Sequence, residues 1–282
     1  MNVVTTKLEL IKQINKYKES NQSIGFVPTM GFLHEGHVKL LEEARKENDI
    51  VVLSIFVNPL QFGVNEDYDS YPRNQQRDEE LAKLSGVDLL FTPSVPEIYP
   101  TEPSYTVKVQ SRVNVLCGRS RKGHFDGVAT ILTKLFNLIK PNRAYFGMKD
   151  AQQVAVIDGL ITEFYFPIEL VSVPTIREAD GLAKSSRNVK LNEKDRNEAP
   201  VIYKSLSKAK NEIAKGERDK EKLKALITTT ISQETDGEID YVEILSYPNL
   251  EEIEVISGKV IIAIAVKFTN ARLIDNITIE VE

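Results

Sequence analysis

Apolar runs and amphipathic segments alternate along the first 175 residues of this 282-residue chain. The run Ile50–Val57 is almost continuously apolar, as expected for a strand buried on both faces, and Glu35–Glu47 before it has the spacing of an amphipathic helix. The same criteria predict helices near Leu8–Glu19, Asn74–Leu84, Gly127–Ile139 and Ala151–Glu163, and strands at Ser23–Pro28, Asp88–Thr92, Arg143–Phe146 and Ile168–Val173. Apolar strands between amphipathic helices predict an α/β protein with a Rossmann-like, doubly wound parallel sheet.

The pattern changes beyond Pro174. Helical segments are followed by strand-like runs in succession, which predicts a small α+β unit. The predicted elements are helices near Glu193–Lys215 and Lys220–Ile231, then strands at Ile239–Leu245, Val260–Phe268 and Ile274–Val281. We therefore expect a larger domain over residues 1–175 and a smaller one over residues 176–282. The polar link Pro174–Gly181 contains a turn signal and can act as a hinge.

Composition narrows the class of protein. The net charge is −5, with charges of both signs dispersed along the chain, so no basic stripe indicates a nucleic-acid-binding surface. A single cysteine excludes an internal disulfide framework, and the N-terminal residues lack the pattern of a signal peptide. The apolar runs are too short to span a membrane. We expect a soluble, cytoplasmic protein with neither nucleic acid nor membrane as its partner.

The ten residues 28–37, PTMGFLHEGH, follow a predicted strand and enter a predicted helix. If that helix begins near His34, then His34 and His37 project from one face of its first turn. Backbone N–H groups at a helix N-terminus attract phosphate oxygens, and Gly31 and Gly36 let a ligand approach the backbone. We call this segment the histidine corner, and its composition predicts nucleotide binding.

A second candidate for anion binding, GLAKSSRN at residues 181–188, follows the hinge. Ser185 and Ser186, flanked by Lys184 and Arg187, can bind phosphate oxygens through neutral and charge-assisted hydrogen bonds. By itself the stretch is also typical of a solvated loop with a helix N-cap. Together with the histidine corner it resembles the H-x-G-H and K-M-S-K-S pair of the nucleotidylyltransferase superfamily, whose shared chemistry is attack on the α-phosphate of ATP with release of pyrophosphate.

A longer series of motifs resembles the pantothenate synthetase (pantoate–β-alanine ligase) family. The matching segments, in the order of the family, are residues 28–37, 54–62 (SIFVNPLQF), 71–73 (YPR), 123–128 (GHFDGV), 146–153 (FGMKDAQQ) and 185–188 (SSRN). The resemblance extends from Gly25 to ARLIDN at residues 271–276.

The resemblance implies that pantoate attacks ATP to give pantoyl adenylate and pyrophosphate, and that β-alanine then displaces AMP. It also implies that the larger domain binds nucleotide and pantoate, that the smaller domain is a lid, and that the chain forms a homodimer. The activity would belong to pantothenate biosynthesis and so to the coenzyme A pathway.

The resemblance also assigns the site. It implies that His37 is the catalytic proton donor, with His34 and Lys149 as further catalytic residues. It places pantoate on Gln61 and Gln153, and β-alanine on Gln61. The residues that it assigns to ATP are Met30, Gly31, Phe32, Leu33, His34, Glu35, Gly36, His37, Gly147, Met148, Lys149, Asp150, Ile176, Lys184, Ser185, Ser186 and Arg187.

Further positions follow from the same resemblance. Those that resemble pocket positions of the family are Asn58, Tyr71, Arg121 and His124. Asp150 or the backbone of Gly147 would contact the ribose hydroxyls. Mg²⁺ is expected to accompany ATP, held chiefly by phosphate oxygens, and the sequence identifies no protein ligand for it.

Three residues depart from the family pattern. Met148 stands where the family usually has Glu, Lys184 where an apolar residue precedes the serines, and Lys122 where Pro is usual. None of these changes removes a group that has an assigned role. Lys184 adds a positive charge beside the expected phosphates and can therefore tune the affinity for ATP.

Other classes of function compete with this interpretation. A zinc site would need further ligands, and the sequence offers one cysteine, Cys117, and one further histidine, His124. A nucleotidyltransferase that leaves AMP on its product would share the phosphate motifs without needing the glutamines. A nucleotide-sensing module could lose a histidine of the corner, whereas both are present here.

Overall fold

The computed structural model describes residues 1–63, 66 and 68–281, and the chain divides into two compact units. The N-terminal unit contains residues 1–111, 121–147 and 156–174. The C-terminal unit contains residues 112–120, residues 148–155 and the chain from Thr175 onward. Two short segments that precede Pro174 in the chain thus belong with the C-terminal unit, a grouping that the hydrophobic pattern did not indicate.

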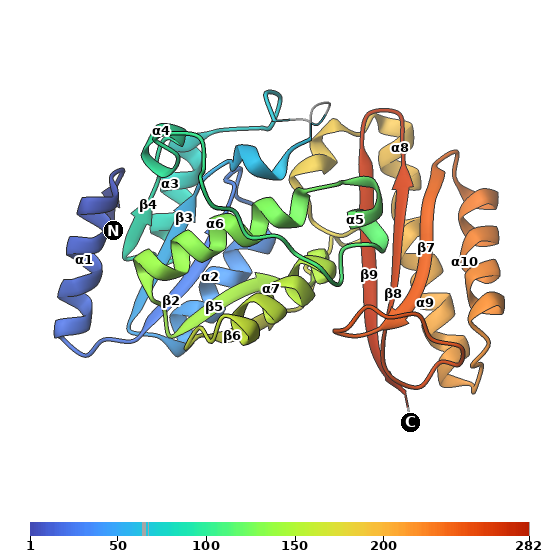
Figure 1. Ribbon diagram of the computed structural model, residues 1–282. Helices are drawn as coiled ribbons and strands as arrows, with labels where there is room; N and C mark the ends of the chain where they lie inside the picture. Colours follow the sequence, from blue (N-terminus) through green and yellow to red (C-terminus); the bar gives the residue numbers. More distant parts are fainter. Residues whose placement is uncertain (64–65, 67, 282) are drawn as a thin grey trace. The chain divides into compact units, whose positions relative to one another are not determined.

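A parallel sheet forms the centre of the N-terminal unit, in the strand order β1-β4-β3-β2-β5-β6 (Figure 1). Its strands are β1 (Asn2–Val4), β2 (Ile24–Thr29), β3 (Ile50–Ile55), β4 (Leu89–Phe91), β5 (Arg143–Gly147) and β6 (Glu169–Val173). This confirms the predicted Rossmann-like sheet. The short strand β1 was not predicted; it pairs with β4 at the edge of the sheet.

Helices cover both faces of this sheet. They are α1 (Lys7–Glu19), α2 (Glu35–Glu47), α3 (Gln75–Leu84), α4 (Val95–Ile98), α6 (His124–Ile139) and α7 (Ala151–Glu163), with the 3₁₀ turn η1 (Pro59–Gln61) after β3. On one face Val27 of β2 packs in a buried cluster with Leu41 of α2 and Ala82 of α3. On the other face Phe26 meets Phe136 of α6 edge to face. Adjacent residues of a strand therefore supply opposite layers of the core.

The strand order places a topological switch point between β2 and β5. From β2 the chain continues to β3 and β4 on one side, whereas β5 and β6 lie on the other. β2 pairs with β3 over its whole length, but with β5 only at Gly25 and Phe26. Because the two strands stop pairing before their carboxyl ends, the turns that follow them can separate and admit a ligand, as is typical of open α/β sheets.

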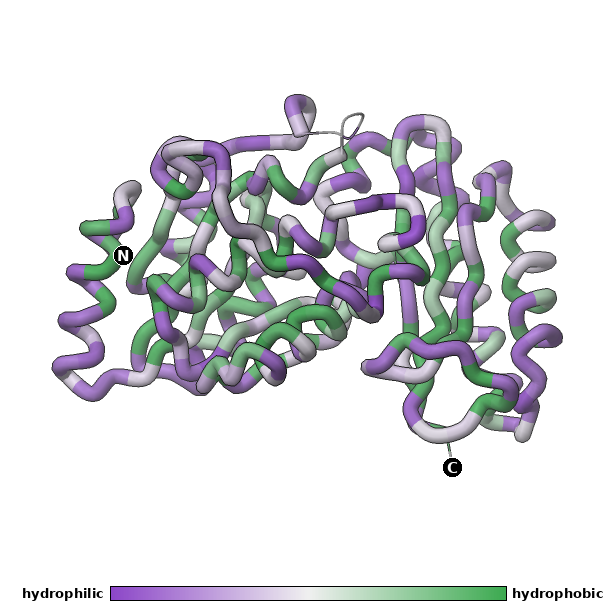
Figure 2. Tube along the Cα trace, in the orientation of Figure 1, coloured by the Kyte–Doolittle hydropathy of each residue, from purple (hydrophilic) through white to green (hydrophobic). Residues whose placement is uncertain are grey.

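The C-terminal unit is built on the antiparallel sheet β7-β8-β9, which confirms the predicted smaller α+β unit. Its elements are η3 (Ser186–Lys190), α8 (Glu193–Glu198), α9 (Val201–Ala214), α10 (Lys220–Glu234), β7 (Glu238–Ser246), β8 (Gly258–Lys267) and β9 (Arg272–Val281). The central strand β8 is largely hydrophobic, whereas β7 and β9 alternate hydrophobic and hydrophilic residues (Figure 2). The single helix predicted over Glu193–Lys215 was wrong, because Pro200 separates α8 from α9 and proline cannot continue a helix interior.

Each face of the antiparallel sheet packs against different segments. On one face Ile262 and Ile264 of β8 share a buried cluster with Leu206 of α9 and Ile227 of α10. On the other face Ile261 and Ala263 pack with residues of the two inserted segments, 112–120 and 148–155; these are Leu116, Ala151 and Ala155. This second cluster explains why the inserted segments belong to the C-terminal unit.

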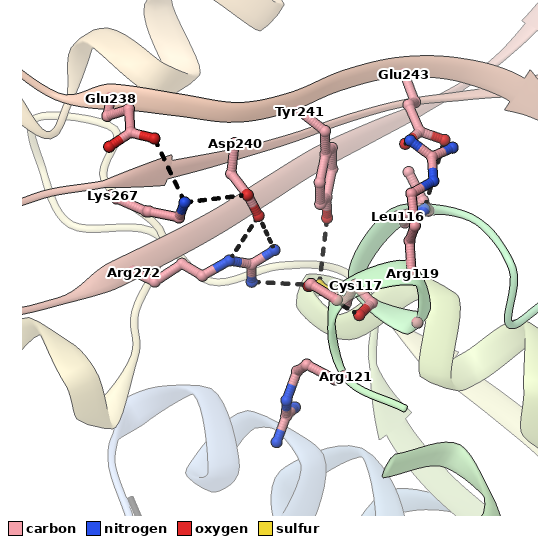
Figure 3. Close-up of polar contacts among 12 residues, drawn as sticks. Leu116, Cys117, Arg119, Arg121, Glu238, Asp240, Tyr241, Glu243, Lys267 and Arg272 are labelled. Atoms are coloured by element: carbon pink, nitrogen blue, oxygen red, sulfur yellow. Dashed lines mark hydrogen bonds and ion pairs between the residues drawn. The ribbon is translucent and has the colours of Figure 1, made fainter. Parts of the chain in front are cut away.

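Polar contacts also bind the segment 112–120, which contains helix α5 (Leu116–Ser120), to the sheet (Figure 3). The sulfur of Cys117 lies 3.3 Å from the hydroxyl of Tyr241 and accepts from Nη1 of Arg272 at 3.5 Å. Arg272 also forms an ion pair with Asp240 at 2.7 Å. Burial raises the pKa of Tyr241, so its phenol stays protonated. The single cysteine is thus a buried packing residue of this unit.

Within the residues that the structure describes, every helix is too short or too polar to cross a membrane.

Candidate functional site

The histidine corner begins where β2 ends. Gly31 and Phe32 follow the strand with φ angles of 86° and 52°, a region that glycine adopts readily and phenylalanine rarely. α2 then begins at Glu35, with His34 as its N-cap. Both imidazoles lie at the start of the helix, with ring centroids 4.1 Å apart. The corner is therefore at the carboxyl end of β2, on one side of the switch point.

Backbone hydrogen bonds to Nδ1 define the neutral tautomer of both rings. The N–H of Gly36 donates to Nδ1 of His34 at 3.1 Å, and the N–H of His34 donates to Nδ1 of His37 at 3.2 Å. Because a ring nitrogen that accepts a hydrogen bond carries no proton, the neutral form of each ring has its proton on Nε2. Gly36 is needed for this arrangement, since a Cβ there would lie 2.8 Å from Cε1 of His34. Each ring presents an Nε2–H donor, which suits an anionic ligand.

Two neighbouring residues of α3 hold the backbone of the corner. The carboxylate of Asp78 accepts from the N–H groups of Phe32 and Leu33, both at 2.7 Å. Its side chain is only 2% exposed, so these bonds are shielded from water. Nη1 of Arg77 donates to the carbonyl of Leu33 at 2.8 Å. The backbone polar groups of the turn are thus satisfied by side chains from a separate helix.

Gln61 lies at the end of η1, close to the corner. Its Nε2 is 4.0 Å from the sulfur of Met30, and its side-chain oxygen accepts from Nδ2 of Asn58 at 3.0 Å. Asn58 is fully buried, donates to the carbonyl of Gly127 at 3.0 Å and accepts from the hydroxyl of Tyr99 at 3.0 Å. Burial raises the pKa of Tyr99, which keeps the phenol a donor. Asn58 therefore fixes the orientation of the Gln61 amide.

Arg121 and His124 support the backbone of Gln61. Nη1 of Arg121 donates to Nε2 of His124 at 3.0 Å, so the imidazole carries its proton on Nδ1 and donates it to the carbonyl of Gln61 at 2.7 Å. Arg121 also pairs with Glu66 at 2.5 Å. Burial acts to raise the pKa of Glu66, but hydrogen bonding to the Arg121 guanidinium and its charge outweigh this and lower the pKa. The carboxylate therefore stays ionised at neutral pH.

In the C-terminal unit, Met148, Lys149 and Asp150 form a 3₁₀ turn, η2, that leads into α7. The ammonium of Lys149 lies 3.6 Å from a carboxylate oxygen of Asp150. Met148 packs against Tyr247, whose hydroxyl lies 3.6 Å from the Met148 sulfur. Met148, which stands where the family usually has Glu, thus packs within the C-terminal unit.

The residues from Ile176 to Lys184 form a small hairpin. The N–H of Lys184 donates to the carbonyl of Ile176 at 2.9 Å, and Arg177 pairs with Ala183 in antiparallel orientation. The ammonium of Lys184 lies 2.8 Å from Glu178, within the hairpin. Glu178 therefore partly neutralises the positive charge of Lys184, which stands where the family usually has an apolar residue.

Ser185 follows the hairpin and caps the 3₁₀ helix η3. Its hydroxyl accepts from the N–H of Arg187 at 3.2 Å. The helix N-cap that is expected if this stretch is a solvated loop is thus present. An N-cap and an anion-binding loop are compatible, since both use the donors at the start of a helix.

The structure places the sequence-predicted residues in two groups. In the N-terminal unit, Met30–His37 follows β2, Gly147 is the last residue of the neighbouring strand β5, and Gln61 lies beside Met30. The C-terminal unit contains the group Met148, Lys149, Asp150, Gln153, Ile176, Lys184, Ser185, Ser186 and Arg187. The described residues contain no group of three or more His, Cys, Asp and Glu side chains able to hold a metal ion.

Sequence reasoning missed the residues that support the site. Arg77 and Asp78 lie in a segment predicted only to be a helix, and Tyr99 lies outside every predicted element. Their contacts join segments far apart in the chain. The only local signal was an acidic residue in the first turn of α3, which is common at helix N-termini.

Comparisons with known proteins give a consistent result. The family model described as pantoate-beta-alanine ligase matches residues 2–278. Pantothenate synthetase of Bacillus pumilus (strain SAFR-032) is 61% identical over 281 residues, which cover 100% of this chain and 97% of that protein. The enzyme of Bacillus subtilis (strain 168) is 57% identical over 283 residues, covering 100% of this chain and 98% of that one.

Solved structures agree. The crystal structure of pantothenate synthetase from Thermus thermophilus matches with a TM-score of 0.93 and 42% identity, covering 98% of this chain and 99% of that one. Pantoate-beta-alanine ligase from Francisella tularensis, complexed with beta-gamma ATP and beta-alanine, matches with a TM-score of 0.77 and 35% identity. That match covers 98% of this chain and 97% of the Francisella chain.

We expect Asp78→Asn to lower the free energy of unfolding by about 1–3 kcal/mol, because an amide NH₂ would then face a backbone donor that keeps no acceptor. Amide hydrogen exchange at Phe32 and Leu33 should accelerate, as measured by NMR or mass spectrometry. Asp195→Asn is the matched control, since Asp195 is similarly buried but bonds the N–H of Thr269. Unchanged exchange at Phe32 and Leu33 in a folded Asp78 variant would contradict the assigned support.

Proposed function

The chain belongs to the pantoate–β-alanine ligase family, whose model matches residues 2–278, and from this premise we propose how its residues divide the work of catalysis. The enzyme ligates pantoate and β-alanine in an ATP-dependent reaction that proceeds through pantoyl adenylate. The products are pantothenate, AMP and pyrophosphate.

The reaction has two displacements. First, a carboxylate oxygen of pantoate attacks the α-phosphorus of ATP, the bond from that phosphorus to the bridging oxygen breaks, and pyrophosphate leaves. Second, the amine of β-alanine attacks the acyl carbon, the bond from that carbon to the AMP oxygen breaks, and the nitrogen loses a proton. The first step passes through a highly charged, in-line transition state, so positioning and charge stabilisation supply most of the acceleration.

One observation supports this assignment most directly. Two segments of the nucleotide set, the histidine corner and Gly147, lie at the carboxyl ends of β2 and β5, the strands on either side of the switch point. Ligands of open α/β sheets bind outside the carboxyl ends of strands at this place. On this basis and on the sequence resemblance, we assign to ATP the whole set of residues that the resemblance indicated.

His37 and His34 are assigned to the transferring phosphates. Since Nδ1 of each ring accepts a backbone hydrogen bond, Nε2–H is the donor that each can offer. A donor aimed at developing negative charge stabilises the transition state more than the ground state. Lys149 is the third catalytic residue of the proposal and acts as a mobile point charge toward phosphate.

Gln61 and Gln153 are assigned to pantoate, and Gln61 also to β-alanine. The amide of Gln61 is oriented by Asn58, so its NH₂ group is a donor of fixed direction. Such a donor can bind a carboxylate or a hydroxyl oxygen of the substrate.

Mg²⁺ is part of the proposal as a companion of ATP. We expect the phosphate oxygens to supply most of its ligands. Bound in this way, the cation would neutralise charge on the phosphates.

The assembly, motion and location of the chain follow from family membership alone. We assign a cytoplasmic homodimer joined through the larger domains, which sedimentation should detect as a mass about twice 31.8 kDa. Residues 176–282 act as the lid, together with the segments 112–120 and 148–155 of the same unit. The hinge lies at the start of the Pro174–Gly181 link, before the hairpin that begins at Ile176. Closure excludes water from an adenylate that would otherwise hydrolyse. Structures with and without ATP test this motion.

The type of reaction is tested by isotope exchange. Labelled pyrophosphate should exchange into ATP when pantoate is present and β-alanine is absent, and a chelator such as EDTA should abolish the exchange. ADP and phosphate as products would contradict the proposed reaction, and an adenylylated final product would indicate a nucleotidyltransferase instead.

His37→Ala should lower kcat by about 10² or more, because one transition-state donor is lost. His37→Asn separates this role from that of the cap, since its side-chain oxygen can still accept from the N–H of His34 while the distal donor is gone. We expect the same loss of kcat in both variants, measured by steady-state kinetics. Near-normal turnover of His37→Asn would show that the imidazole serves only to cap α2.

Gln61→Ala should raise KM for pantoate and for β-alanine by about tenfold while changing KM for ATP much less, because a hydrogen bond to each small substrate is lost. Gln75→Ala, on the exposed surface of α3, is the control and should leave all three values unchanged. An equal rise for the three substrates would indicate that Gln61 has a structural role instead.

A further inference from the structure

The segment RLIDN at residues 272–276 belongs to the resemblance with the family, but the proposed function gives it no role. It forms the first half of β9, an edge strand of the antiparallel sheet. Asp275 and Asn276 are buried, with exposed fractions of 4% and 8%. Two adjacent buried polar side chains on an edge strand need partners. The partners of Asn276 are Met148 and Lys149 of the nucleotide set, and the partner of Asp275 is Arg177, which follows Ile176 of that set.

Asn276 holds the turn that contains Lys149. Its Nδ2 donates to the carbonyl of Met148 at 2.9 Å and to the carbonyl of Lys149 at 3.0 Å. An amide NH₂ has two protons, so both donors are used on one short stretch of backbone. The bonds fix the course of the turn from which the Lys149 side chain emerges.

Asp275 holds the hairpin that precedes Ser185. It forms a two-pronged ion pair with Arg177, at 2.6 and 2.9 Å. The same guanidinium donates to the carbonyl of Gly181 at 3.1 Å and lies 3.6 Å from the ring centroid of Tyr203 in α9. Arg177 therefore joins the carboxylate on β9 to the tip of the hairpin.

The alternation of side chains along a strand explains how neighbours reach different segments. Successive residues of β9 point to opposite faces of the sheet. Leu273, two residues before Asp275, packs in the cluster that contains α9, and Arg177 lies against Tyr203 of that helix. Asn276 meets Met148, which packs in the cluster on the other face. Asp275 and Asn276 thus contact segments on opposite faces of the sheet.

We propose that Asp275 and Asn276 are positioning residues that hold the Lys149 turn and the Ile176–Arg187 segment in one fixed arrangement for ATP. This inference rests on the proposed function, because it takes both segments to be ATP-binding. A common support keeps Lys149 and the serine loop at a constant spacing, so the ammonium and the loop donors reach the phosphates together. The conformational entropy of Lys149 and the serine loop is then lost when the chain folds and not when ATP binds.

Asn276→Asp tests the inference with almost no change in size. The aspartate cannot donate to the two carbonyls, so the Lys149 turn loses its support. We expect KM for ATP to rise about tenfold or more while KM for pantoate stays within about twofold. The same increase should appear in the dissociation constant of a non-hydrolysable ATP analogue, measured by calorimetry.

Asn48→Asp is the matched control. Asn48 is 7% exposed, and its Nδ2 donates to the carbonyl of Ala44 at 2.8 Å and to the hydroxyl of Tyr145 at 2.7 Å. It lies at the carboxyl end of α2, away from the residues assigned to ATP. We expect a similar fall in Tm without the rise in KM for ATP. If Asn276→Asp raises that KM no more than the control does, the positioning role is overturned.

Arg177→Lys provides a second, milder variant that serves if Asn276→Asp does not fold. It keeps a positive charge beside Asp275 but loses the two-pronged geometry, so it should also raise KM for ATP. The double variant tests whether the arrangement is shared. If both contacts hold one arrangement, its KM should rise by less than the product of the two single effects. Effects that multiply would show that the segments are held independently and would overturn the proposal.

Pyrophosphate exchange by the wild-type enzyme tests the proposed function separately. Exchange with pantoate in the wild type, together with unaltered ATP affinity in both variants, would refute the positioning role alone. Absence of exchange in the wild type would refute the proposed reaction, and the calorimetric comparison of the variants would still decide whether Asp275 and Asn276 govern nucleotide affinity.

Discussion

The turns that leave regular structure in this protein depend on one constraint: buried backbone N–H and C=O groups need partners. At the histidine corner that need is met by Asp78, which accepts from two consecutive backbone donors. At the Lys149 turn it is met by Asn276, which donates to two consecutive carbonyls. In both places a buried side chain of matching polarity substitutes for a helix or strand neighbour. The turns can therefore be irregular and still be rigid.

The parallel sheet decides where such turns can serve a ligand. β2 and β5 share hydrogen bonds only near their amino ends, so the backbone diverges toward the carboxyl ends. The chain then turns into α2 on one side and into η2 on the other. A ligand with several charged oxygens needs donors from more than one direction, and a switch point supplies them without interrupting the core. The apolar strands and helices beneath provide the stiffness.

The polar supports also determine the chemical state of the groups that they hold. The neutral forms of His34 and His37 carry their ring proton on Nε2 because their Nδ1 atoms accept from the backbone. His124 has the opposite tautomer because Arg121 donates to its Nε2. Three histidines of one unit thus have defined protons from local geometry alone. For adenylyl transfer, where positioning dominates, fixed donors cost no reorganisation at the transition state.

The sequence by itself determined which segments form strands and helices, and it indicated that the histidine corner suits a nucleotide. Continuous apolar runs such as Ile50–Val57 predicted buried strands, and the spacing of His34 and His37 placed both rings at a helix start. These features are local, since they depend on periodicity and on residues a few positions apart. The resemblance to the family added the substrates, which no periodicity could supply.

Tertiary structure decided the rest, because it depends on contacts between distant segments. The segments 112–120 and 148–155 belong to the C-terminal unit because their apolar residues pack on one face of its sheet. Asp78 and Asn276 are each ordinary in sequence, and their partners lie 45 or more residues away. The pairing between buried polar groups and turns is decided only when the whole core packs. The reason is that an unpaired polar group costs free energy only when it is buried in the folded chain.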